Sequence, residues 1–195
     1  MNKIFVIMGK SATGKDTIYK ELLKKKELSI KPVVPYTTRP IREGEKEGVE
    51  YHFVDTVTYK QMKEQKKIIE YRDYNTVHGV WSYFTVNDAQ FSGEEDVILI
   101  NTLEGYEQIV SYFGAEQVIP IYIQVEDGER LSRALYRERQ QKQPKYQELC
   151  RRFLADDKDF SEERLKQCKI TARYDNVDME QCLKKIEETI RGYHS

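Results

Sequence analysis

Cysteine, proline and tryptophan are scarce in this chain of 195 residues, which contains three, five and one of them respectively. The cysteines are too few and too widely separated for a disulfide framework, and they match no spacing typical of a metal site. We therefore expect reduced thiols in a cytoplasmic protein. These residues are Cys150, Cys168 and Cys182.

An excess of charge of either sign is also missing, because 32 basic and 33 acidic residues give a net charge of -1. This balance gives no support for nucleic acid as a partner. The opening stretch MNKIFVIMGK has one short apolar run, too short to span a membrane, so we interpret it as neither signal peptide nor anchor. We expect one soluble core with inserted subregions.

Short apolar runs alternate with helical patterns, which predicts an α/β fold with a parallel sheet. Residues 3–9, 96–101 and 118–125 are typical of buried strands. A helix between the last two completes a β-α-β unit, which implies parallel strands. The helices expected beside these strands cover about residues 16–27, 104–113 and 178–191.

Two stretches interrupt this alternation. Residues 34–87 are rich in Tyr, Thr and Val and predict a small mixed sheet with one helix, whereas residues 126–160 predict a charged helical insertion broken near Pro144. We therefore expect a three-layer α/β/α core carrying a β-rich insertion and a helical one. The core is assigned to residues 1–33, 88–125 and 161–195.

The segment GKSATGKDT, residues 9–17, matches the phosphate-loop pattern G-x-x-x-x-G-K-[ST] except at its last position. The expected strand precedes it and a helix follows, so backbone N–H groups and a helix N-terminus can meet a phosphate there. Lys15 would reach the transferred phosphates. The residues predicted to hold ATP phosphates are Gly9, Ala12, Thr13, Gly14, Lys15, Asp16 and Thr17.

Asp16 occupies the position where the pattern has a hydroxyl residue. The carboxylate has three interpretations: a first-turn charge that suits the helix dipole, a ligand of Mg²⁺ directly or through water, or a repulsive group that disables the loop. A bridging dication would turn repulsion toward a triphosphate into attraction. We therefore predict that Asp16 is a magnesium ligand.

A second motif, TTRPIREGEKEGVEYHFV, covers residues 37–54. Arg39, Arg42 and Tyr51 could converge on a phosphate dianion through bidentate hydrogen bonds. Taken alone, the stretch could equally be a solvated basic hairpin. Together with the phosphate loop before it, it closely resembles the guanylate kinase signature, and the resemblance extends over nearly the whole chain.

The resemblance implies specific roles. In guanylate kinases the two arginines and the tyrosine hold the phosphate of GMP, and Glu45 matches the glutamate that supports the arginine pair. Glu70, in EYRDY, matches the glutamate that accepts hydrogen bonds from the guanine edge. The helical insertion matches the family's lid, whose arginines stabilise the transferring group. With a one-residue shift these arginines are Arg133, Arg137 and Arg152, catalytic residues alongside Lys15.

Several positions depart from the family pattern besides Asp16. Pro35 replaces a serine that contacts guanine, and Tyr83 takes the place of the acceptor-site tyrosine only after a one-residue slip. Ile100 and Thr102 replace two aspartates at a strand end, the second of which helps to read guanine. The phosphate-binding positions are intact, whereas the base-reading positions are partly replaced.

The sequence therefore predicts an ATP- and Mg²⁺-dependent nucleoside monophosphate kinase, acting on GMP or dGMP as a cytoplasmic monomer or homodimer. Two alternatives stay open. One is a related kinase with another acceptor, a deoxynucleotide or a sugar phosphate. The other is a guanylate-kinase-like module that binds a partner without catalysis.

Overall fold

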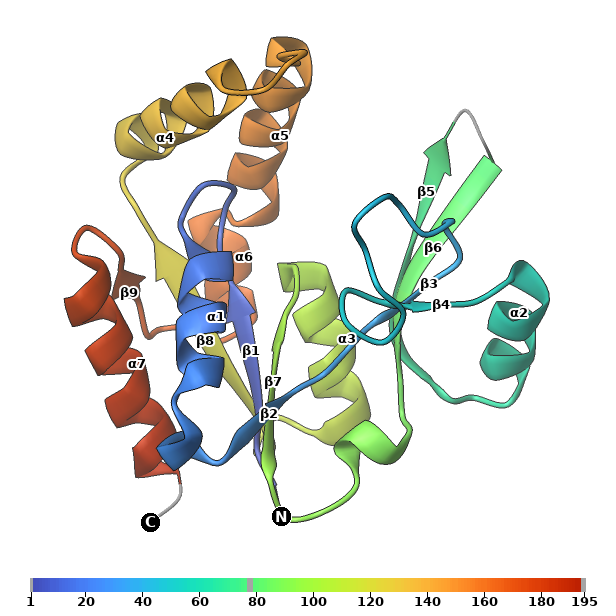
Figure 1. Ribbon diagram of the computed structural model, residues 1–195. Helices are drawn as coiled ribbons and strands as arrows, with labels where there is room; N and C mark the ends of the chain where they lie inside the picture. Colours follow the sequence, from blue (N-terminus) through green and yellow to red (C-terminus); the bar gives the residue numbers. More distant parts are fainter. Residues whose placement is uncertain (1, 77–78, 194–195) are drawn as a thin grey trace.

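The computed structural model describes residues 2–76 and 79–193 (Figure 1). Its strands are β1 (Ile4–Met8), β2 (Ile30–Pro32), β3 (Tyr36–Thr37), β4 (His52–Phe53), β5 (Ile68–Thr76), β6 (Gly79–Val86), β7 (Asp96–Ile100), β8 (Val118–Gln124) and β9 (Tyr174–Asp175). Its α-helices are α1 (Lys15–Lys24), α2 (Thr56–Glu64), α3 (Leu103–Phe113), α4 (Asp127–Arg139), α5 (Tyr146–Asp159), α6 (Glu162–Gln167) and α7 (Met179–Gly192), and the 3₁₀ turns are η1 (Lys26–Leu28) and η2 (Ala89–Phe91).

The central sheet has five parallel strands in the order β2-β7-β1-β8-β9. The expected strands β7 and β8 are parallel, but they flank β1 instead of pairing with each other. Because all strands point the same way, their carboxyl ends meet at one edge of the sheet. The segment that follows β1 emerges at the middle of this edge, where ligands bind in open α/β sheets.

Helices cover both faces of this sheet, which confirms the three-layer core. On one face α1 and α7 bury Ile18, Leu22 and Ile186 against the strands. On the other face α3 packs Leu103 and Ile109 against the same strands. Because both faces are covered, β1 is buried at every position and reads in the sequence as a continuous apolar run.

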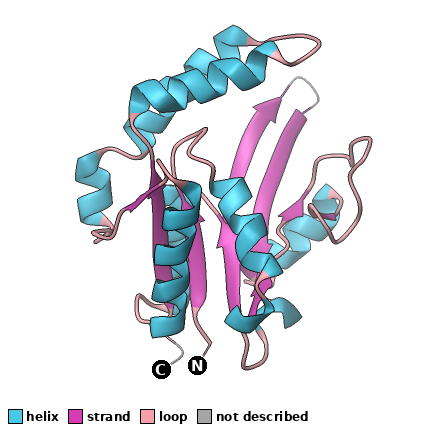
Figure 2. Ribbon diagram, turned by 60° about the vertical axis from the view of Figure 1, so that its left-hand side comes forward, coloured by secondary structure: helices cyan, strands magenta, loops and turns pink. Residues whose placement is uncertain are grey.

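The β-rich insertion is a separate four-stranded sheet in the order β4-β3-β6-β5. It is mixed, as expected, because β3 pairs parallel with β4 and antiparallel with β6. A small core under this sheet contains Tyr59 of α2 together with Phe84 and Val86 of β6. The long β5–β6 hairpin rises beside the central sheet (Figure 2).

The helical insertion consists of α4 and α5, which are separated by the segment around Pro144, as the sequence predicts. The two helices lie above the carboxyl edge of the central sheet, with the β5–β6 hairpin on the other side of that edge (Figure 1). Among the described helices, none is both long and apolar enough to cross a bilayer.

Candidate active site

The loop between β1 and α1 is a tightly packed glycine turn. Gly14 has a φ of 85°, and a Cβ there would lie 2.5 Å from Nδ2 of Asn176. A Cβ on Gly9 would overlap the carbonyl oxygen of Ile123. The hydroxyl of Thr13 donates to the carbonyl oxygen of Lys10 at 3.0 Å and closes the turn. Both glycines are therefore required by close packing around the loop.

Lys15 begins α1 directly after this loop, with Asp16 and Thr17 exposed in the first helical turn. Burial lowers the pKa of Lys15, and the charges of Asp16 and Asp156 partly oppose that effect. Arg137 lies close enough to lower the same pKa. A cationic end of a helix lined by backbone N–H groups can bind a polyphosphate.

The helical insertion is fastened to the loop by a charged cluster that sequence reasoning missed. Arg130 is fully buried, donates from Nη1 to the carbonyl oxygen of Ser11 at 3.1 Å and pairs with Asp127 at 2.7 Å. Asp156 accepts from the N–H of Ser11 at 2.7 Å, and Lys10 pairs with Asp157 at 2.6 Å. These residues lie far apart in the sequence, so no local pattern signals the cluster.

The three lid arginines lie near the loop but in different settings. Arg133 pairs with Glu129 and donates to the carbonyl oxygen of Asn176 at 3.3 Å. Arg137 and Arg152 line a small recess together with Ser11. None of the three lines the cavity of about 760 Å³ between α1 and the second sheet.

The second motif forms a compact cationic unit. Both terminal nitrogens of Arg39 donate to the carboxylate of Glu45, at 2.6 and 2.7 Å, and its guanidinium lies over the rings of Tyr51 and Phe53. The backbone N–H of Arg42 donates to the same carboxylate at 2.9 Å. Arg39 is buried, whereas Arg42 is exposed. Glu45 therefore orients the side chain of Arg39 and fixes the backbone at Arg42.

The Arg39–Glu45 pair predicts a distinct acid dependence of stability. Hydrogen bonds from Arg39 lower the pKa of Glu45 from its ordinary value of 4.5 to about 2. A lowered carboxyl pKa stabilises the fold above the ordinary value, and this stabilisation is lost as the pH falls from 4.5 toward 2. Thermal unfolding of the wild type and Glu45→Gln should differ above this window and converge below it. A difference that stays constant through the window would contradict the assignment.

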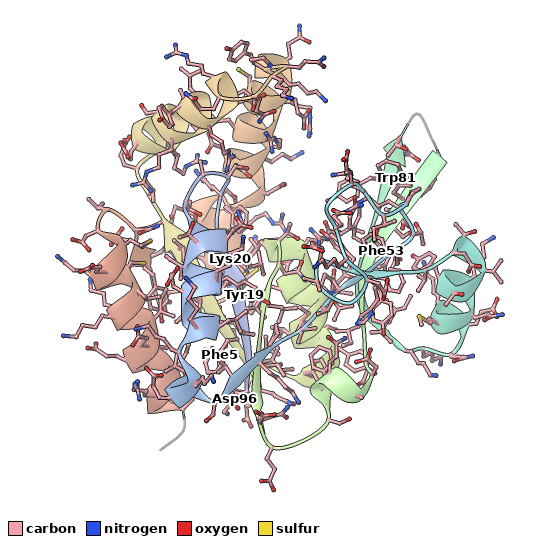
Figure 3. The ribbon with its side chains drawn as sticks, viewed as in Figure 1. Phe5, Tyr19, Lys20, Phe53, Trp81 and Asp96 are labelled. Atoms are coloured by element: carbon pink, nitrogen blue, oxygen red, sulfur yellow. The ribbon has the colours of Figure 1, made fainter. Side chains whose placement is uncertain are left out.

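A cavity of about 760 Å³ joins the two regions. On the α1 side the cavity is lined by Lys15, Asp16, Tyr19 and Lys20. Figure 3 labels Tyr19 and Lys20, and Phe53 of the second sheet lies across from them. Six of the predicted site residues line it: Lys15, Asp16, Tyr51, Glu70, Tyr83 and Thr102. The other predicted residues are not among those that line it: Gly9, Ala12, Thr13, Gly14, Thr17, Arg39, Arg42, Glu45, Arg133, Arg137 and Arg152.

The β5–β6 hairpin supplies the far wall of this cavity. Glu70 is buried, and its Oε1 accepts from the hydroxyl of Thr85 at 2.7 Å. Thr85, a residue that sequence reasoning missed, pairs across the strands with Glu70, just as Tyr83 pairs with Arg72. Tyr83 and Thr85 therefore both face the cavity. An alignment of this strand to the family without gaps does not predict that pairing.

Thr102, just after β7, is a weaker hydrogen-bond acceptor than the sequence alone implies. The hydroxyl of Thr102 already accepts from the N–H of Gly105 at 3.2 Å, as the N-cap of α3. The neighbouring Asn101 is buried, and its Oδ1 accepts from the N–H of Thr102 at 2.8 Å. The wall near α3 therefore offers a ligand few free acceptors.

Carboxylates that could hold a metal are sparse at the site. In the described part of the chain there is no group of three or more His, Cys, Asp or Glu side chains arranged for a metal ion. Asp16 is exposed at the cavity beside Lys15. Mg²⁺ in phosphoryl-transfer sites is usually held by one or two carboxylates, substrate phosphates and water, so a lone Asp16 fits that ion.

Comparisons with known proteins identify similar sequences and a similar structure. The sequence profile of the family described as "Guanylate kinase" matches residues 1–193. The chain is 33% identical over 136 residues to a guanylate kinase of Dechloromonas aromatica, covering 68% of this chain and 63% of that protein. It is 35% identical over 121 residues to a guanylate kinase of Syntrophomonas wolfei, covering 61% and 60% of the two chains. The matches thus span somewhat less than two thirds of these relatives.

Among solved structures, the fold resembles that of a guanylate kinase from Anaplasma phagocytophilum. The TM-score is 0.62, the identity is 22%, and the match covers 98% of this chain and 86% of that one. At this identity the likeness establishes the shared architecture of the two chains.

Proposed function

The chain belongs to the guanylate kinase family, and from that premise we propose that it transfers the γ-phosphoryl group of ATP to GMP or dGMP in a Mg²⁺-dependent reaction. One observation carries the proposal. A single cavity connects the lysine of a phosphate loop to the tyrosines and the buried glutamate of the second sheet. A donor polyphosphate and an acceptor nucleotide can therefore occupy one cavity.

The donor end is assigned to residues 9–17. The backbone N–H groups of the loop bind the β- and γ-phosphates, and Lys15 balances the charge that spreads onto the transferring group. Arg133, Arg137 and Arg152 of the helical insertion approach this group when the insertion closes. Arg130, at the base of α4, also lies 3.5 Å from Asp157 of α5 and would stay in place while the outer ends of both helices move.

The acceptor end is assigned to the β-rich insertion. Arg39, Arg42 and Tyr51 hold the acceptor phosphate, with Glu45 orienting the inner arginine and Tyr83 completing the site. Glu70 accepts from the N1–H and N2–H₂ groups of guanine. An acceptor phosphate oxygen then attacks the γ-phosphorus in line, and no general base is required because that oxygen is already anionic. Catalysis is positioning combined with charge neutralisation.

We assign donor binding, acceptor binding and closure to three different parts of the chain. The core of residues 1–33, 88–125 and 161–195 holds the donor loop, residues 34–87 bind the acceptor, and residues 126–160 form the lid. Closure of both insertions excludes water, so ATP is not simply hydrolysed. We propose a cytoplasmic enzyme acting on free nucleotides, with the three cysteines as free thiols.

Asp16 is the proposed magnesium ligand, directly or through water. When bound, Mg²⁺ would neutralise charge on the β- and γ-phosphates as a Lewis acid. Asp16→Asn should raise the Mg²⁺ concentration needed for half-maximal rate by about 10-fold, since the amide keeps the shape and loses the charge. A magnesium titration of both proteins measures this. An unchanged requirement would show that Asp16 is only a first-turn helix residue.

A coupled assay of ADP release over a panel of monophosphates tests the proposed function. The panel contains GMP, dGMP, AMP, CMP, UMP and ribose 5-phosphate, each with ATP and Mg²⁺. We expect the highest kcat/KM with GMP and dGMP. Higher activity with another member would identify a kinase with a different acceptor, and an absence of both ATP binding and turnover would favour a binding module.

A further inference from the structure

The cavity face of the β5–β6 hairpin presents four polar side chains in a square. Glu70 and Arg72 are two residues apart on β5 and therefore share one face of the sheet. Their cross-strand partners on β6 are Thr85 and Tyr83 respectively. All four residues line the 760 Å³ cavity.

Two atoms of this square lack hydrogen bonds. Oε2 of Glu70 and Nε of Arg72 are the buried side-chain atoms without a hydrogen-bond partner over residues 2–76 and 79–193. They form an ion pair at 3.8 Å, which is too long for a hydrogen bond between them. The Glu70 side chain is 2% exposed, and its other oxygen is engaged by Thr85. A buried polar atom without a hydrogen bond is unfavourable, so the site favours a ligand that makes hydrogen bonds to both atoms.

The ligand must offer an acceptor beside a donor. Guanine has the acceptor O6 next to the donor N1–H, whereas adenine has the donor N6–H₂ next to the acceptor N1. We propose that Arg72 is a specificity-determining residue that donates to O6 of guanine while Glu70 accepts from N1–H. This inference rests on the proposed function of the same cavity.

The arrangement also accounts for the replaced base-reading positions. Thr102 stands where the family has an aspartate, and its hydroxyl is occupied by the N–H of Gly105. An arginine two residues beyond Glu70 adds a charged donor on the opposite wall, and charge-assisted hydrogen bonds are about twice as strong as neutral ones. Recognition of the base is thereby shifted from the strand end to the hairpin.

The competing role for Arg72 is to bind the acceptor phosphate, because its strand partner Tyr83 stacks edge-on against Tyr51 at 5.6 Å between ring centroids. The two roles differ in their dependence on the base. A phosphate contact serves every monophosphate equally, whereas an O6 contact serves only bases that carry this oxygen.

The test compares kcat/KM of the wild type and Arg72→Met for three acceptors. GMP and IMP carry O6 and N1–H, whereas 2-aminopurine riboside monophosphate lacks both. We expect Arg72→Met to lower kcat/KM about 10- to 100-fold for GMP and IMP, the scale of a good arginine–guanine contact. The value for the 2-aminopurine nucleotide and the KM for ATP should stay within about twofold.

Lys67→Met is the matched control, since it removes the same charge from an exposed position just before β5, and its three values should equal those of the wild type. Arg72→Lys, which keeps a charged donor, should recover part of the GMP activity. An equal loss for all three acceptors in Arg72→Met would overturn the O6 assignment.

Calorimetric measurement of the affinities for GMP and for the 2-aminopurine nucleotide gives the same comparison without turnover. If no monophosphate is phosphorylated, the proposed function fails, and a selective loss of GMP affinity would still support Arg72.

Discussion

Replacing Lys15 with methionine should lower kcat by about 10³-fold or more while the chain remains folded. The reason is electrostatic. Lys15 is the cation at the start of α1, the charges of Asp16 and Asp156 favour its protonated form, and it lines the cavity that we assign to the transferring phosphoryl group. Removing one preorganised donor from such a site typically costs about 10²–10³-fold, and removing a full charge from phosphoryl transfer costs more.

Steady-state kinetics with ATP and GMP, together with thermal unfolding, measure this effect. Lys24→Met provides the control, because Lys24 is on the same helix, is 68% exposed and pairs with Glu21 at the far end from the loop. Its kinetics should match the wild type. A Lys15→Met enzyme that retains a tenth of the wild-type kcat would exclude the assigned role.

Arg39→Met should lower kcat/KM for the acceptor by about 10²- to 10³-fold, equivalent to roughly 3–4 kcal/mol of transition-state stabilisation. Arg39 is buried, makes two hydrogen bonds to Glu45 and stacks over Tyr51. Truncating Arg39 removes this cation from the proposed phosphate site and leaves the partly buried Glu45 without its partner. The loss should appear mainly in the acceptor KM, with the KM for ATP nearly unchanged.

Arg164→Met serves as the comparison, because Arg164 pairs with Glu107 at 2.9 Å on α6 and does not line the cavity. It should leave all kinetic parameters unchanged. Arg39→Lys tests the need for the planar guanidinium and should recover little activity, since a lysine cannot make the bidentate pair. Equal increases in the KM values for ATP and acceptor would point to a general structural defect.

Local patterns in the sequence predicted the parts of the fold that carry strong periodicity. The buried strands β1, β7 and β8 are continuous apolar runs because helices cover both faces of the sheet. The glycine loop could be identified because two positions tolerate no side chain. The break near Pro144 was likewise visible, because proline interrupts helical hydrogen bonding.

Features that depend on distant contacts were not predicted. The edge strands β2 and β9 are only three and two residues long, so they carry no pattern of their own. Arg130 looks like one more charge on a polar helix, and only the fold places it between Ser11 and Asp157. Thr85 was missed because the register of the β5–β6 hairpin is set by strand pairing and cannot be read from an ungapped alignment.

The central claim is phosphoryl transfer from ATP to a guanine monophosphate in the shared cavity. Incubating the protein with Mg²⁺, GMP and ATP labelled at the γ-phosphate, then separating the products, follows the labelled group directly. The account predicts label in GDP, equimolar unlabelled ADP and little labelled inorganic phosphate. Label that appears only in inorganic phosphate, or that stays in ATP while GMP is unchanged, would contradict it.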